Sequence, residues 1–201
     1  MRIAPVALYS MIDGRLSIEE ADRLAGDTAA ITHKHPLGYI SAALAAHVIY
    51  RLSEDKLPTR EDLLHHIREG LSVVENLYRI ERDEITQMTH LVTLATEYAQ
   101  NGKSDVENIE KLGGGWIAEE ALAISLYCCL RHFSSFEKAI IAAVNHGGDS
   151  DSTGAITGNI LGAAVGYDAI PDIFKTDLEL HDVILHMADD LFRGELTVFD
   201  H

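Results

Sequence analysis

Two aspartates and a serine in the stretch "GGDSDSTGAITGNILGAAVG", residues 147 to 166, could do chemistry together. Asp149, Asp151 and Ser152 follow a glycine pair and open an apolar, small-residue run that is typical of a buried helix. Carboxylate and hydroxyl oxygens are the ligands that hard divalent cations prefer. Acidic residues at a helix start also cap free amide groups and complement the helix dipole, but capping needs only one of them. The second aspartate therefore favours a metal site over a helix cap.

Two familiar aspartate motifs fit this stretch poorly. Counted from Asp149, a calcium loop of the EF-hand type finds Asp151 and Gly154 in place, but Ile160 stands where a bidentate glutamate is required. The letters "DSDST" also have the form of the aspartate-nucleophile phosphatases, whose motif follows a β-strand. Here the preceding segment, 136–146, has helical spacing instead. Neither motif explains the aspartates.

The segments that must position these residues all have sequence patterns typical of helices. Capping patterns at Ser17, Thr59 and Ser134 each precede apolar residues at steps of three and four. Helices are expected at about 18–32, 36–52, from 59 onward, 81–100, 104–111, 112–132, 134–146, 149–166 and 177–196. The connections between them are short, which predicts one all-α domain over residues 1–201, a bundle of eight or nine helices.

Glycines recur every fourth residue in the predicted helix that follows the aspartates. Gly154, Gly158, Gly162 and Gly166 fall along one slowly drifting face. Each glycine costs about 1 kcal/mol relative to alanine inside a helix. We therefore expect a close neighbour along that face and a central place for the helix.

Composition limits the classes of partner. The chain of 201 residues is 47% hydrophobic, which suits one domain, and carries 32 acidic against 16 basic residues, a net charge of −16. Such a surface repels phosphate backbones, so general nucleic-acid binding is not expected. No apolar run reaches the ~18 residues of a membrane span, and no signal peptide is recognisable. The adjacent Cys128 and Cys129 suit core positions in a reducing compartment, so a cytoplasmic location is expected.

As a whole, the sequence resembles the ADP-ribosylglycohydrolase family, the all-α hydrolases that include the dinitrogenase reductase-activating glycohydrolases. The matching segments are "MRIAPVAL" at 1–8, "ITHKHPLGYISAAL" at 31–44, "LGGGWIAEEALAISLYCCLRHF" at 112–133 and "AAVNHGGDSDSTGAITGNILGAAVG" at 142–166. They follow the family's order. The last segment is the most specific, because the family's pattern is Gly-Gly-Asp-Thr-Asp-Thr before a small-residue helix. Serines at 150 and 152 preserve the hydroxyl groups of the threonines.

The resemblance implies a site with two divalent cations, Mg²⁺ or Mn²⁺. Asp149, Asp151 and the Ser152 hydroxyl would be ligands. Paired cations can orient the ribose hydroxyls of an ADP-ribosyl group and generate hydroxide for attack at the anomeric carbon. The implied reaction is hydrolysis of the glycosidic bond between ADP-ribose and an acceptor, either an ADP-ribosylated protein or a small-molecule conjugate.

The resemblance also implies contacts with the ADP-ribose. His33 would contact the phosphates or the ribose, and Gly115 and Trp116 would line the adenosine end, with Trp116 offering an aromatic face. From the residues alone, His33 could equally be a histidine favoured by the dipole at a helix C-terminus, and Trp116 could belong to the core.

One departure from the family bears on catalysis. In the family, a portion before the "MRIAP" segment carries a Thr-Asp-Asp metal triad and a catalytic glutamate, and this sequence starts at Met1 of that segment. Its Asp189-Asp190 pair lies in the last predicted helix without a preceding threonine. The general base is therefore expected outside this chain, and the two cations are expected to be incompletely liganded.

Three hypotheses of different classes remain. The chain is a family hydrolase whose N-terminal portion is missing or supplied by another polypeptide, a catalytically inactive ADP-ribose-binding or structural relative, or an unrelated helical interaction protein. An apolar face left uncovered by the missing portion would favour self-association or a partner polypeptide.

Overall fold

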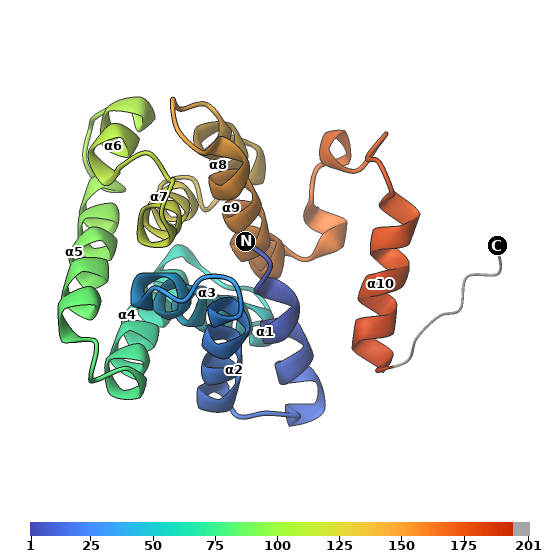
Figure 1. The fold of residues 1–201 in the computed structure, drawn as a ribbon. Helices are drawn as coiled ribbons and strands as arrows, with labels where there is room; N and C mark the ends of the chain where they lie inside the picture. Colours follow the sequence, from blue (N-terminus) through green and yellow to red (C-terminus); the bar gives the residue numbers. More distant parts are fainter. Residues whose placement is uncertain (195–201) are drawn as a thin grey trace.

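The structure, a computed structural model, describes residues 1–194, and within that range it is helical without β-strands (Figure 1). Short 3₁₀ turns occur at Ile12–Gly14, Tyr167–Ala169 and Asp172–Phe174. The α-helices are α1 (Ala4–Met11), α2 (Ile18–Ala30), α3 (Pro36–Glu54), α4 (Arg60–Leu77), α5 (Arg82–Tyr98), α6 (Asp105–Leu112), α7 (Ala118–Arg131), α8 (Phe136–Val144), α9 (Ser150–Val165) and α10 (His181–Arg193).

The all-α class is confirmed, with one helix more than expected over residues 1–194. The extra helix is α1, which the sequence reasoning did not identify; Pro5 lies in its first turn. Capping boxes form at Ser17, Thr59 and Ser104 with Glu20, Asp62 and Glu107. The cap of α8 is Ser135, one residue after the predicted Ser134, and its side chain accepts a hydrogen bond from the Lys138 amide. The predicted last helix extended to 196, and its final two residues lie outside the described range.

Helices α3 and α7 form the centre of the molecule (Figure 1). α3 packs against α1, α2, α4, α5, α7 and α9, and α7 is buried along nearly its whole length. Their N-terminal ends lie at the surface of this assembly, where neighbouring elements can converge on them.

The glycine-bearing face of α9 is only partly in close contact. A Cβ at Gly154 would lie 2.7 Å from Cγ1 of Val144 on α8, and one at Gly158 would lie 3.7 Å from Cδ1 of Ile140. At Gly162 and Gly166 a Cβ would meet nothing within 4 Å in the described structure. The expectation of a close neighbour along the whole face is thus wrong beyond the first half of α9.

Helix α10 lies at the side of the assembly and approaches α1 (Figure 1). Arg15 Nη2 donates a hydrogen bond to the Phe192 carbonyl at 3.4 Å. None of the residues of α10 is buried, and Ile184, Met187 and Phe192 are exposed apolar side chains. Among the described residues, no helix is both long and apolar enough to cross a membrane.

Cys128 and Cys129 are free thiols buried in the core, as the sequence predicted. Burial raises the pKa of both thiols. Since the thiolate is the reactive form, we predict that neither thiol reacts with DTNB at pH 8 in the native chain, whereas two react per chain after denaturation. Rapid labelling of the native chain would contradict this description of the core.

Candidate active site

A cavity of about 1080 Å³ opens where the N-terminal ends of α1, α3, α7 and α9 meet the loop after α2. Helix N-termini carry partial positive charge, which favours anionic groups nearby. The side chains that give the cavity its polar character come from six segments of the chain. They are Arg2, Thr32, His33, Lys34, His35, Ser41, Gln87, Glu119, Asp149, Ser152 and Asn159.

The oxygen cluster at the start of α9 lies at this cavity. Asp149 is the N-cap residue of α9, yet its side chain makes no capping hydrogen bond to the backbone. Asp149 Oδ2 instead accepts a hydrogen bond from Ser152 Oγ at 2.8 Å. The neighbouring Asp151 and the hydrogen bond from Ser152 together lower the pKa of the Asp149 carboxyl. The structure thus brings the three predicted oxygen ligands together, but Asp151 is exposed and does not line the cavity.

A close backbone contact fixes this cluster against the glycine turn before α7. The Asp149 amide donates to the Gly114 carbonyl at 2.8 Å, and a Cβ at Gly148 would lie only 1.9 Å from the same oxygen. On the other side of the turn, Glu120 Oε2 accepts from the amides of Gly114 and Gly115 at 3.0 and 3.1 Å. The hydrogen bonds to the Glu120 carboxylate and from the Asp149 amide thus hold the glycine turn from two sides.

His146 shapes the loop from within, a role that the sequence did not reveal. Its Nδ1 accepts from the Gly148 amide at 3.1 Å, so Nε2 carries the proton and donates to Thr153 Oγ1 at 2.9 Å. Thr153 Oγ1 in turn donates to the Ala143 carbonyl at 2.7 Å. These bonds join the end of α8 to the first turn of α9.

His33 lies at the cavity within a group of cationic and polar residues. His33 Nδ1 is 2.8 Å from Thr32 Oγ1, and Arg2 Nη2 donates to the same hydroxyl at 2.5 Å. Lys34 and His35 also line the cavity. In a chain with a net charge of −16, this local group of basic side chains favours an anionic ligand. Arg2 and Lys34 were missed in the sequence, although both belong to segments that carried the family resemblance.

Trp116 and Gly115 form another part of the wall. Trp116 is 72% exposed, so it is not a core residue, and its ring covers the backbone of Gly114, where an added Cβ would lie 2.6 Å from Cδ1. Gly115 has φ of +73°, which side-chain-bearing residues rarely adopt. An exposed indole at a cavity rim is suited to stacking on a planar ring.

Glu119 is a further polar group in the wall, at the start of α7. It is buried, and Oε1 accepts a hydrogen bond from Gln87 Nε2 at 3.0 Å. Burial raises the pKa of its carboxyl. In the sequence, this glutamate looks like an ordinary acidic residue in the first turn of a helix.

Comparisons with known proteins relate the whole chain to one family. A family model described as ADP-ribosylglycohydrolase matches residues 1–198. ADP-ribosylhydrolase ARH3 from Bos taurus is 26% identical over 210 residues, which cover 96% of this chain and 56% of that protein. ADP-ribosyl-[dinitrogen reductase] glycohydrolase from Rhodospirillum rubrum is 26% identical over 165 residues, or 81% of this chain and 46% of that protein.

One shorter match has a higher sequence identity than these two. ADP-ribosylarginine hydrolase Tri1 from Serratia proteamaculans is 41% identical over 58 residues, which cover 29% of this chain and 16% of that protein. The chain spans about half the length of the curated relatives that it matches.

The contact between Gly148 and Gly114 leads to a stability prediction. Gly148→Ala should destabilise the chain by about 1–3 kcal/mol, because the new methyl group overlaps a backbone carbonyl that cannot move freely. Gly147→Ala is the matched control, since a Cβ there meets nothing within 4 Å in the described structure. Urea unfolding of the two variants measures the difference, and equal free energies of unfolding would refute the constraint.

Proposed function

This chain belongs to the ADP-ribosylglycohydrolase family, and we propose that it is a hydrolase that cleaves the glycosidic bond between ADP-ribose and an acceptor. The observation that carries the proposal is one cavity lined both by oxygen ligands at the start of α9 and by basic side chains around His33. Cations and a pyrophosphate need these two kinds of environment. We further propose that residues 1–201 act as one domain in the cytoplasm.

Asp149, Asp151 and Ser152 would hold Mg²⁺ or Mn²⁺. The donor set fits hard cations because it consists of oxygens, and the carboxyl of Asp149 is free of backbone capping. Divalent cations supply a positive centre that orients ribose hydroxyls and activates water for attack at the anomeric carbon. Three side chains are few ligands for two cations, so water or groups beyond these three complete the coordination in this proposal.

The substrate-binding roles follow the two walls of the cavity. His33, with Arg2 and Lys34 beside it, would bind the phosphates, since charge-assisted hydrogen bonds to phosphate oxygens are strong. Trp116 would stack on the adenine, and Gly115 would let the nucleoside approach the backbone closely. The acceptor is an ADP-ribosylated protein or a small ADP-ribose conjugate.

The alternative function is binding of ADP-ribose without turnover. In this proposal the general base lies outside the residues that line the cavity, and the chain spans only about half the length of its curated relatives. An unrelated helical interaction protein is excluded, because the family model matches residues 1–198. Binding and turnover must therefore be measured separately.

We predict that Mn²⁺ and ADP-ribose together raise the melting temperature of the chain relative to EDTA. A ligand at a hundred times its Kd stabilises by ~2.7 kcal/mol, which is roughly 5–10 °C for a chain of this size. Asp151→Ala should abolish the shift and keep the helical content, because Asp151 is exposed. Asp189→Ala removes another exposed carboxylate, on α10, and should keep the shift.

Release of ADP-ribose from an ADP-ribosylated protein in Mg²⁺ or Mn²⁺ then separates the two functions. Release by the wild-type chain that Asp151→Ala loses supports the hydrolase. A melting shift without release supports the binding relative. If Asp151→Ala shows the same melting-temperature shift as the wild type, the assignment of Asp151 as a metal ligand is wrong.

The exposed apolar side of α10 supports a proposal about assembly. We propose that Ile184, Met187 and Phe192 are covered by self-association of the chain, with a different polypeptide as the alternative. Sedimentation velocity should find concentration-dependent dimers or larger species, and Phe192→Asp should shift the chain toward monomer. A monomeric wild-type chain over the whole concentration range would contradict self-association.

A further inference from the structure

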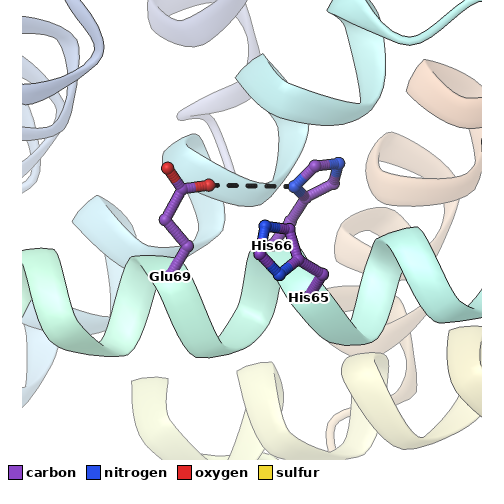
Figure 2. Close-up of side chains that lie close together, drawn as sticks. All are labelled: His65, His66 and Glu69. Carbon is purple, nitrogen blue, oxygen red and sulfur yellow. Dashed lines mark ion pairs between the residues drawn. The ribbon is translucent and has the colours of Figure 1, made fainter.

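Three potential metal ligands lie together on α4, away from the cavity. His65, His66 and Glu69 occupy positions i, i+1 and i+4, and one ligand atom from each lies within 4.8 Å of the others. Figure 2 shows the three side chains on one stretch of the helix, with the His66 ring directed toward the Glu69 carboxylate. His65 is exposed, His66 is buried, and none of the three lines the cavity.

A contact between His66 Nε2 and the Asp55 carboxylate orients the His66 ring so that Nδ1 can act as a metal ligand. Nε2 lies 2.8 Å from Asp55 Oδ2, so the proton resides on Nε2 and Nδ1 presents its lone pair. A carboxylate that holds the far nitrogen of an imidazole in this way is the usual support of a metal-binding histidine. Asp55 follows α3 directly, and its carboxylate therefore fixes the ring orientation from a different element.

The other ring nitrogen of His66, Nδ1, has no hydrogen-bond partner among the described residues. Nδ1 is buried and makes no hydrogen bond within the described residues, and Glu69 Oε2 lies 3.8 Å from it. That separation is too long for a hydrogen bond. Two ligands at about 2.1 Å from one ion lie up to about 4 Å apart, so an ion between Nδ1 and Oε2 fits the spacing.

The surrounding charges favour a cation. Glu69 accepts from Arg51 Nε at 3.0 Å, and this interaction lowers the pKa of the Glu69 carboxyl, which keeps it ionised. Glu54 also pairs with Arg51, and Asp55 pairs with His66, so the carboxylates of Glu54, Asp55 and Glu69 outnumber the one guanidinium in this group. Each carboxylate oxygen retains a second lone pair for a metal.

A second buried nitrogen faces the same carboxylate oxygen. His47 Nδ1 is 2.7 Å from Asp22 Oδ2, and its Nε2, which is buried without a hydrogen bond, lies 3.5 Å from Glu69 Oε2. Two imidazoles, each supported by an aspartate, thus direct an unsatisfied nitrogen toward Glu69. Buried polar atoms without partners are costly, and a bound ion or water removes that cost.

We propose that His65, His66 and Glu69 bind one divalent transition-metal ion, with Zn²⁺ as the expected ion and Asp55 as the positioning residue for His66. Imidazole nitrogens select zinc-like ions, whereas Mg²⁺ and Mn²⁺ prefer the oxygens at the start of α9. The exposed His65 ring turns slightly to complete the site. Because the ion would link α4 to the end of α3 through Asp55, its role is structural, and the proposal does not depend on the hydrolase activity.

The test is a Zn²⁺ titration of the chelator-treated full chain against a chromophoric zinc chelator, in the presence of excess Mg²⁺. We expect one tight zinc site per chain, and His65→Ala should bind zinc more weakly by about tenfold or more. His65 is exposed, so the fold should be retained. His90→Ala, an exposed histidine on α5, is the matched control and should bind as the wild type does.

Three more variants separate this site from the cavity. His33→Ala and Asp151→Ala, which change the cavity, should leave zinc binding unchanged, and Asp55→Asn should weaken it by about 10–100-fold. Co²⁺ should give visible d–d bands in the wild type that His65→Ala lacks. Absence of zinc binding by the wild-type chain would mean that only water fills the space, and equal affinities of wild type and His65→Ala would also overturn the proposal.

Discussion

The candidate site depends on a backbone contact between two glycine turns. The Gly148 backbone lies so close to the Gly114 carbonyl that no Cβ fits between them, and the Asp149 amide donates to that same carbonyl. Because α7 is buried and α9 packs against it, neither turn can retreat without moving a core helix. The oxygen cluster of α9 and the wall at Trp116 are thereby held at one cavity by two residues that offer no side-chain chemistry.

Convergence of helix ends gives the cavity its electrostatic character. Four helices present their positively polarised N-termini there, with basic side chains from the loop after α2, in a molecule whose net charge is −16. Asp149 provides negative charge at one of those ends, where it is stabilised both by the dipole and by Ser152. A single pocket can therefore accommodate cations and anions at once, which the overall charge of the chain would not suggest.

Local signals in the sequence predicted the elements well and the contacts between them less well. Capping residues and apolar spacing located nine of the helices in residues 1–194, whereas α1 is short and gave no such signal. Glycine spacing predicted a close neighbour along α9, but the spacing does not say how far α8 extends, and α8 reaches only Gly154 closely. Arg2 became part of the cavity through packing of α1 on α3, which no local pattern encodes.

The buried pair of Asp22 on α2 and His47 on α3 connects Glu69 of the α4 cluster with the helix that leads to the cavity. Asp22 of α2 is fully buried, its pKa is raised by burial, and its partner is His47 of α3. Removing one member of a buried pair of this kind typically costs about 3–5 kcal/mol, since the other group is left uncompensated. The pairing therefore fixes how α2 lies on α3, and α2 leads directly into the loop that carries His33. The buried Asp22–His47 pair thus sets the position of His33, the proposed phosphate-binding residue. Asp22 lies in the first half of α2, and His33 follows the C-terminal end of that helix.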